Sequence, residues 1–365
     1  KVSRTKLAYL IDATAAPVCI IAPISSWAAA VSGFVEGEDG FSIFIRAIPY
    51  NYYALLTIVM MIALVMLNIN FGPMKTYEEN ALKGDLFTDG NDAAKEEAVP
   101  LNTKGKVIDL VIPIITLITC CVIGMIYTGG FFEGENFITA FSNSDASVGL
   151  ALGSIFAMLI TIIIYLIRRV LTFSECMECL PAGFKAMVPA ILILTFAWTL
   201  KAMTDSLGAA EFVASAMAQS AEGLMNFLPA IIFLVGCFLA FSTGTSWGTF
   251  GILIPIVVAV FANSNPQLMI ISISACMAGA VCGDHCSPIS DTTIMASAGA
   301  QCNHVNHVTT QLPYALLAAA VSFVTYIVAG FTQNAWISLP IGIILLLAVL
   351  LVIRSVQAKK QPTNN

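Results

Sequence analysis

The chain has 365 residues, of which 58% are hydrophobic and only 10% are charged, and its formal net charge is −6 at pH 7. Soluble domains carry about 25% charged residues, so this composition argues against an ordinary soluble domain. The 16 Lys and Arg residues are scattered near the ends of apolar runs, so we expect no nucleic-acid partner. Several apolar runs exceed ~18 residues, the length that crosses a bilayer core, and they predict an all-α polytopic membrane protein.

The first apolar run, at about 7–34, is interrupted by polar residues and by Pro17 and Pro23. Prolines remove backbone donors and break a helix, so we predict a spanning segment with an irregular middle. Asp12 and Thr14 lie in this run. They are candidates for an ion-binding site, although they could equally form a simple interfacial start of the span.

The middle of the chain is predicted to be a series of spans joined by polar segments. Segment 74–106 is rich in charge and is predicted to be a solvated cytoplasmic loop. Segment 129–147 contains acids but no Lys or Arg, so the positive-inside rule predicts that it lies outside. Four runs have the length of spans, and they are residues 51–71, 107–127, 148–167 and 186–204.

Region 223–262 is apolar except for a stretch rich in hydroxyl groups, residues 242–249, in its middle. As one helix the region would be about 60 Å long, roughly twice the bilayer core. We therefore predict a re-entrant hairpin whose tip is buried in protein or faces a water-filled cavity. The candidate binding side chains at this tip are Ser242, Thr243, Thr245 and Ser246.

The stretch 282–293 gathers polar groups within an apolar run, and it is the leading candidate for a binding site. Ionisable groups at membrane depth are costly and mark the path of an ion or substrate. We predict that helix 267–300 is broken here, so that its free carbonyls and nearby side-chain oxygens suit Na⁺. The predicted ligands are Asp284, Asp291, Ser287, Ser290 and Thr292. A carboxylate binds either Na⁺ or H⁺, so Asp284 and Asp291 are also the candidates for proton coupling.

Plainer interpretations stand beside these. Asp284 or Asp291 could cap a helix at a cytoplasmic end without binding a ligand. We favour a hydrogen-bonded structural role for His285 over a proton carrier. We interpret His304 and His307 as solvated loop histidines near the cytoplasmic surface.

The positive-inside rule gives the orientation of the chain. With the basic first residues inside, a hairpin that enters and returns places the basic C-terminal tail in the cytoplasm. The predicted topology has eight spans and one re-entrant hairpin, and its last two spans are residues 309–332 and 336–353.

Residues 12–26 resemble residues 284–293, since each stretch has an acid, small polar residues, a proline and then hydroxyls. On the predicted topology the two run in opposite directions, as an inverted repeat requires. Because a hairpin precedes only the second copy, we expect the chain to be truncated at its N-terminus. The predicted parts are the end of the first repeat at 1–50, intervening spans at 51–222, the second repeat at 223–332, and the last span with its tail at 333–365.

Residues 283–293 and their continuation to Tyr314 resemble the NhaC-type Na⁺/H⁺ antiporter family, and residues 6–17 and 242–249 are similar to two more of its motifs. The resemblance implies a place in the ion transporter superfamily, whose inverted repeats each hold a hairpin and a broken helix. It implies a secondary transporter of a bacterial inner membrane, with Na⁺ and H⁺ as its ions and the lipid bilayer around it. An enzyme and a cofactor are not expected.

Relatives of this family also carry organic acids or amino acids, as malate/lactate exchangers do. A Na⁺- or H⁺-coupled carrier of a small organic anion therefore stays as the alternative function. A channel or a non-transporting scaffold belongs to a different class, and the segments interrupted by proline argue against it. A homo-oligomer is left open by the sequence.

Overall fold

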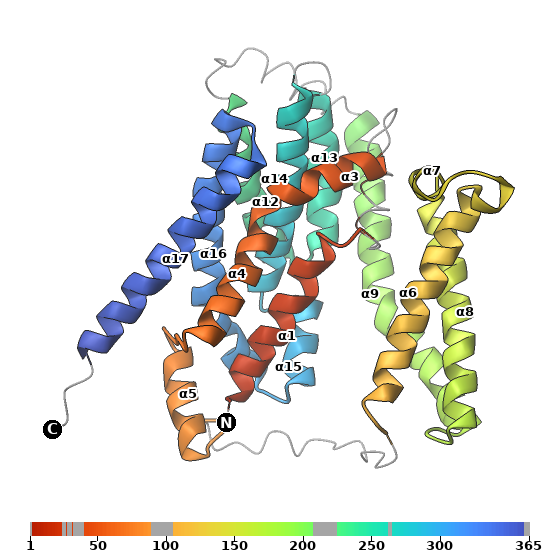
Figure 1. The fold of residues 1–365 in the computed structure, drawn as a ribbon, viewed down its shortest axis with the longest axis horizontal. Coiled ribbons are helices and arrows are strands. Elements are labelled where there is room, and N and C mark those ends of the chain that lie inside the picture. The colour runs from red at the N-terminus through yellow and green to blue at the C-terminus, as the bar shows by residue number, and fades with distance from the viewer. Residues whose placement is uncertain are drawn as a thin grey trace. The chain divides into compact units, whose positions relative to one another are not determined.

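The computed structural model describes residues 2–23, 27, 31, 40–88, 105–206, 225–261 and 265–360, and within these ranges it is helical without strands (Figure 1). The chain divides into two compact units. The first unit consists of Lys1–Ala22, Ile43–Glu96 and Phe196–Asn365, and the second of Pro23–Ser42 and Glu97–Thr195.

Helix α14 (Pro266–Cys286) forms the centre of the first unit, and every residue from Leu268 to Cys286 is buried. This burial explains a sequence that is apolar all round and lacks an amphipathic pattern. The helices of the unit around it include α1 (Arg4–Cys19), α4 (Tyr52–Met66), α5 (Met74–Lys83), α12 (Leu228–Thr243), α13 (Ser246–Phe261), α15 (Asp291–Gly299), α16 (His304–Thr332) and α17 (Ala335–Lys360).

Helices α12 and α14 run parallel at very close range. A Cβ on Gly279 would overlap the carbonyl oxygen of Phe233, and a Cβ on Gly283 would overlap the carbonyl oxygen of Cys237. From the first contact to the second, the residue numbers rise by four on both helices, as they do only when the helices are parallel. Helix α13 joins the two and runs in the opposite direction. The turn from α12 into α13 begins at Gly244, which has the left-handed conformation (φ 65°) that ends many helices.

Helices α12 and α13 therefore form a helical hairpin within the predicted region 223–262. Each has 16 residues, fewer than a full span of about 20 residues needs. Whether this hairpin enters and leaves on the same side of a bilayer stays a prediction. Residues 223–224 and 262 lie outside the described ranges.

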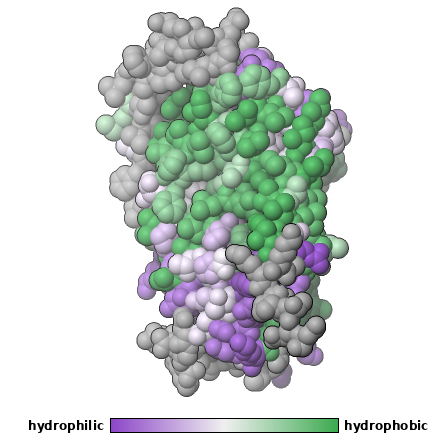
Figure 2. Space-filling view, turned by 90° about the vertical axis from the view of Figure 1, so that its left-hand side faces the viewer, coloured by the Kyte–Doolittle hydropathy of each residue, from purple (hydrophilic) through white to green (hydrophobic). Residues whose placement is uncertain are grey.

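Five helices in the described part of the chain are long and apolar enough to cross a membrane, or six if a pair bent by 48° counts as one span. The prediction of a multi-pass helical membrane protein is confirmed at this level. On the face shown in Figure 2, hydrophobic residues form a broad band, with hydrophilic residues gathered toward one end of it. The five helices are Ile108–Thr128, Val148–Ile167, Pro266–Cys286, His304–Thr332 and Ala335–Gln357, and the bent pair is Ser42–Tyr50 with Tyr52–Met66.

The count falls below the predicted eight spans for two reasons. The run predicted at 7–34 begins with α1, which has only 16 residues, and residues 24–26 after it lie outside the described ranges. The span predicted at 186–204 is part of the 34-residue helix α9 (Phe173–Ser206), which also takes in the predicted interfacial segment 171–185 from Phe173 onward. Most side chains of α9 after Lys185 lie outside the described part of the chain, so the count does not test this predicted span.

The prediction of a solvated loop at 74–106 is wrong at its beginning, where residues 74–83 form α5. Met74, Glu78 and Ala81 lie on one face and are buried. The Glu78 carboxylate pairs with Lys6 Nζ at 3.3 Å, and Lys6 Nζ also donates to Asn70 Oδ1 at 2.9 Å. Charged residues on the opposite face made this amphipathic helix look like a loop. Residues 89–104 of the predicted loop lie outside the described ranges.

The second unit is built on α6 (Ile108–Thr128) and α8 (Ala146–Ile167), which pack antiparallel through glycines. A Cβ on Gly124 would overlap the Gly149 carbonyl, and a Cβ on Gly153 would press on the Cys121 backbone. Near the other end of the pair, Arg168 Nε donates to Asp109 Oδ1 at 2.6 Å. The short elements η3 (Phe131–Glu133) and α7 (Phe137–Ser142) connect the two helices.

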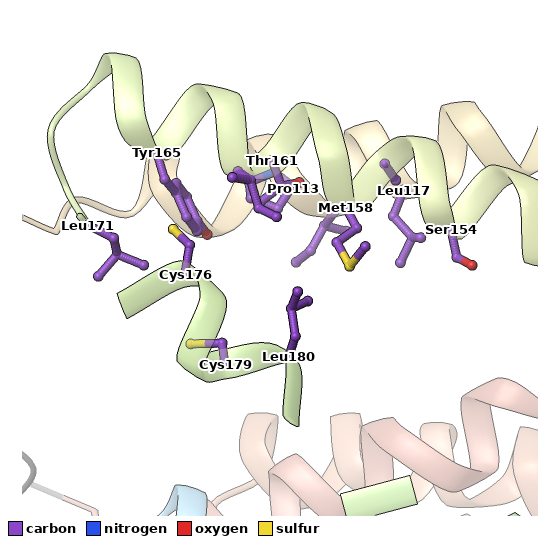
Figure 3. Close-up of a pocket in the computed structure, with 13 residues that line it drawn as sticks. Pro113, Leu117, Ser154, Met158, Thr161, Tyr165, Leu171, Cys176, Cys179 and Leu180 are labelled. Atoms are coloured by element: carbon purple, nitrogen blue, oxygen red, sulfur yellow. The ribbon is translucent and has the colours of Figure 1, made fainter. Parts of the chain in front are cut away.

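A pocket of about 360 Å³ lies between α6, α8 and the beginning of α9 (Figure 3). Its wall is mainly apolar and includes Cys176 and Cys179, which the sequence places at a metal-like spacing. No second pair of ligands accompanies them, and no group of three His, Cys, Asp or Glu residues that could hold a metal ion occurs among the described residues.

Candidate functional site

The helix predicted at 267–300 is interrupted where its polar residues gather. Helix α14 ends at Cys286 and α15 begins at Asp291. Ser287, which follows α14, has an extended backbone, and the next residue is Pro288, which has no N–H to continue the helix. The last carbonyls of α14 therefore depend on partners outside the regular helix, and the Asp284 carbonyl accepts from the Ser287 N–H at 3.0 Å.

The tip of the α12–α13 hairpin lies directly against this interruption. Ser287 Oγ donates to the Phe241 carbonyl oxygen near the end of α12 at 2.9 Å. A Cβ on Gly244 would collide with Ile289, so only glycine permits this approach. The structure thus brings together two of the stretches singled out from the sequence.

Asp284 lies on the last turn of α14 and is only 2% exposed. Its carboxyl group interacts with the hydroxyls of Ser246 and Ser290, and with the charge of Asp291. Its Oδ1 atom has no hydrogen-bond partner among the described residues. A buried carboxylate oxygen without a donor is costly, so this atom marks a place where a cation or proton is expected.

Asp12 forms a second buried acidic centre in the middle of α1, with no exposed surface. Its Oδ2 atom accepts from Gln311 Nε2 at 2.8 Å and lies 3.4 Å from His307 Nε2, both on α16. His285 Nε2 of α14 lies 3.9 Å from the same oxygen. On the far side of His285, its Nδ1 atom lies 2.7 Å from the hydroxyl of Tyr53 on α4.

The two acidic centres are adjacent, since His285, which lies 3.9 Å from Asp12 Oδ2, directly follows Asp284 in α14. Within the described ranges, no Lys or Arg forms an ion pair with either carboxylate, and Lys6 is paired with Glu78 instead. Two buried carboxylates without a fixed cation attract mobile cations, because the low local dielectric strengthens the interaction.

The other predicted residues of the broken segment lie around Asp284. Asp291 is the first residue of α15 and is exposed. Ser290 Oγ and Thr292 Oγ1 lie 2.9 Å apart, and Ser287 uses its hydroxyl to hold the hairpin tip.

Three predicted side chains are not brought together with the carboxylates. The exposed hydroxyls of Thr14, Ser242 and Thr243 each donate to a carbonyl of their own helix at 2.8 Å. Thr245 is half-buried at the turn, where its carbonyl accepts from the Thr249 hydroxyl.

The interpretation of His307 as a solvated loop histidine is wrong, since it lies within α16 with no exposed surface. His304 begins the same helix, is half-buried, and donates from Nε2 to the Pro288 carbonyl at 2.6 Å. The helix is signalled in the sequence by the spacing of three residues that share one helical face, His307, Gln311 and Tyr314. The predicted span at 309–332 begins five residues after the start of α16 and therefore leaves out His307.

Sequence reasoning also missed two other buried groups. Thr293, on the first turn of α15, has no exposed surface, and its Oγ1 atom has no partner among the described residues. Tyr53 belongs to an apolar span whose sequence gives no sign that its hydroxyl meets His285.

Residues 7–331 of the chain match a family of proteins described as the Na⁺/H⁺ antiporter family. The chain is 40% identical over 348 residues to an uncharacterized protein of Haemophilus influenzae, covering 92% of this chain and 65% of that protein. No solved structure matches the chain.

Two shorter similarities point to named transporters. The chain is 30% identical over 112 residues to a malate-2H(+)/Na(+)-lactate antiporter of Bacillus subtilis, covering 29% of this chain and 24% of that protein. It is 33% identical over 120 residues to an uncharacterized Na(+)/H(+) antiporter of Haemophilus influenzae, covering 31% of this chain and 25% of that protein. The chain thus spans less than two thirds of the length of each relative.

Proposed function

The chain belongs to the Na⁺/H⁺ antiporter family, and we propose that it exchanges Na⁺ for H⁺ across the cytoplasmic membrane by alternating access. The observation that carries this proposal is the buried carboxyl group of Asp284. It lies where a helix is interrupted, beside two hydroxyls, with one oxygen unpartnered among the described residues.

A single carboxyl group can couple the two ions. An ionised carboxylate in the interior is unstable without a counter-charge, so it is neutralised either by a proton or by a bound Na⁺. Binding of one therefore favours release of the other, which is the basic requirement for exchange. Asp291 and Asp12 add negative charge nearby and favour a cation over an anion.

Oxygen atoms around Asp284 supply the remaining ligands of this proposed site. The hydroxyls of Ser246 and Ser290 face the carboxyl group, and Thr292 lies beside Ser290. The C-terminal end of α14 also presents the negative end of the helix dipole, which is suited to Na⁺. The proposed site leaves out Thr14, Ser242 and Thr243, because these side chains are exposed and point to carbonyls of their own helices.

The hairpin and the interrupted helix provide the two elements that alternating access needs. The tip of the hairpin covers the site from the side of α12 and α13, and Ser287 holds it there. Movement of this hairpin against the rest of the unit would expose the site to one side of the membrane at a time. The positive-inside rule supports a cytoplasmic position for the basic end of α17, which contains Arg354, Lys359 and Lys360.

Everted membrane vesicles that contain the protein test the proposal. Addition of Na⁺ should dissipate an imposed pH gradient without any organic substrate, and Asp284→Asn should abolish this response, because an amide cannot alternate between a proton and Na⁺. Thr14→Val serves as the control, since its hydroxyl is exposed and bonded to Leu10 O. An unchanged response in Asp284→Asn would contradict the role of this residue.

A second candidate function is the coupled transport of an organic acid, and the similarity to the malate-2H(+)/Na(+)-lactate antiporter favours it. The same vesicles distinguish the two functions. If Na⁺ alone has no effect but Na⁺ together with malate or lactate dissipates the gradient, the organic-acid carrier is correct.

A further inference from the structure

Gln311 lies at a junction between three helices, and its side chain has no part in the proposed ion chemistry. It lies on α16 and is 1% exposed. Its Nε2 atom donates to Asp12 Oδ2 on α1 at 2.8 Å and to the His285 carbonyl oxygen on α14 at 2.5 Å. One side-chain amide therefore connects α1 and the interrupted end of α14 to α16.

The two partners explain why an amide is needed at this position. The His285 carbonyl is among the last four of α14, which lack partners within the helix. The Asp12 carboxylate also needs a donor. A side-chain amide has two N–H donors on one nitrogen, so it can serve both acceptors at once without adding a charge. Lysine would add a charge, and a hydroxyl would provide only one donor.

The junction leaves two buried oxygen atoms unpartnered within the described ranges. They are Asp12 Oδ1 and Gln311 Oε1. Buried polar atoms in native proteins nearly always have a hydrogen-bond partner. Two unpartnered oxygens on side chains that are hydrogen-bonded to each other therefore point to a missing ligand or to a strained state. Asp284, the residue before His285, is the proposed Na⁺ site.

We propose that Gln311 is a positioning residue for transport, which holds the Asp12 carboxylate against the broken end of α14 so that Asp12 and Asp284 act as one site. The inference rests on the proposed Na⁺/H⁺ exchange. When Na⁺ replaces the proton on Asp284, or the reverse, the end of α14 is displaced. The His285 carbonyl and the Gln311 amide transmit this displacement to Asp12. Gln311 thus sets how strongly the second carboxylate assists Na⁺ binding.

The test measures Na⁺-dependent dissipation of a pH gradient in proteoliposomes over a range of Na⁺ concentrations. Gln311→Leu removes both donors and should raise the KM for Na⁺ about tenfold, with a smaller change in kcat, as expected for the loss of a hydrogen bond to a charged group. Gln311→Asn keeps the amide but is one methylene shorter, so it reaches one partner and should give an intermediate KM.

Ser322→Ala is the matched control, because Ser322 lies on the same helix, is fully buried, and donates only to the Ala318 carbonyl of that helix. Its KM should equal that of the wild type. If Gln311→Leu and Gln311→Asn have the same KM as Ser322→Ala, and differ only in thermal stability, Gln311 is merely structural and the inference is wrong.

A second measurement separates this inference from the proposed function. If the wild-type protein shows no Na⁺ response, the exchange is wrong, and thermal unfolding of Asp12→Asn, Gln311→Leu and the double variant still tests the junction. Strongly non-additive effects of the two changes support the bridge, whereas additive effects overturn it.

Discussion

At the scale of single residues, burial and hydrogen bonding separate the candidate ligands from hydroxyls that only resemble them. Ser246 and Ser242 lie on the same hairpin, four residues apart, yet Ser246 is 5% exposed and faces Asp284, whereas Ser242 is exposed and bonded to Phe238 O. Sequence composition alone treats the two serines as equivalent. Their difference comes from tertiary packing, because the turn at Gly244 directs Ser246, and not Ser242, toward Asp284.

This difference makes a direct prediction. Ser246→Ala should raise the KM for Na⁺ several-fold, roughly the worth of one hydrogen bond or ligand to a charged group, while Ser242→Ala should leave it unchanged. The measurement is Na⁺-dependent dissipation of a pH gradient in vesicles that contain equal amounts of each variant. A KM for Na⁺ that is unchanged in both variants would show that Ser246 does not contribute to the site.

Two acids of the proposed site, Asp284 and Asp12, stand out in the sequence because carboxylates within apolar runs are rare and costly. The side chains that surround Asp12 could not be predicted in this way. Gln311 and Tyr53 come from distant parts of the chain, and nothing local in either segment encodes their meeting with Asp12 or His285. His307 was misinterpreted because the beginning of α16 is polar enough to look like a loop.

At the scale of the elements, the hairpin and the helix interruption follow from local rules. Gly244 permits the turn, Pro288 prevents the helix from continuing, and neither depends on distant residues. The fit between α12 and α14 is different, since it requires glycine at the places where the two backbones touch. The helix α5 was missed because charged residues cover its exposed face and one more, Glu78, lies on its buried face, where its partner Lys6 is 72 residues away.

The close packing of α12 on α14 gives a stability prediction. Gly279→Ala places a Cβ against the Phe233 carbonyl oxygen and should lower the free energy of unfolding by about 1–3 kcal/mol through overpacking. Gly299→Ala, at the end of α15, meets no atom within 4 Å and serves as the control. Thermal unfolding of both variants in detergent provides the comparison. If Gly279→Ala is as stable as Gly299→Ala, the helices are not in the described contact.

At the scale of the whole molecule, the sequence predicted a multi-pass helical protein of the antiporter family, and both are confirmed. The composition made the first prediction possible, and a long specific motif made the second. The division into two units could not be predicted, because it depends on which helices pack together rather than on any property of one helix. The predicted inverted repeat depends partly on residues 24–26, which lie outside the described ranges, and it stays a prediction.

The central claim is that Asp284 couples Na⁺ to H⁺, and uptake of isotopically labelled Na⁺ into proteoliposomes tests it most directly. An outward-directed proton gradient should drive Na⁺ accumulation by the wild-type protein without malate or lactate. Asp284→Asn should abolish the accumulation, and Asp284→Glu, which keeps a titrating carboxyl group, should retain part of it. Proton-driven Na⁺ uptake that is equal in the wild type and in Asp284→Asn would contradict the account.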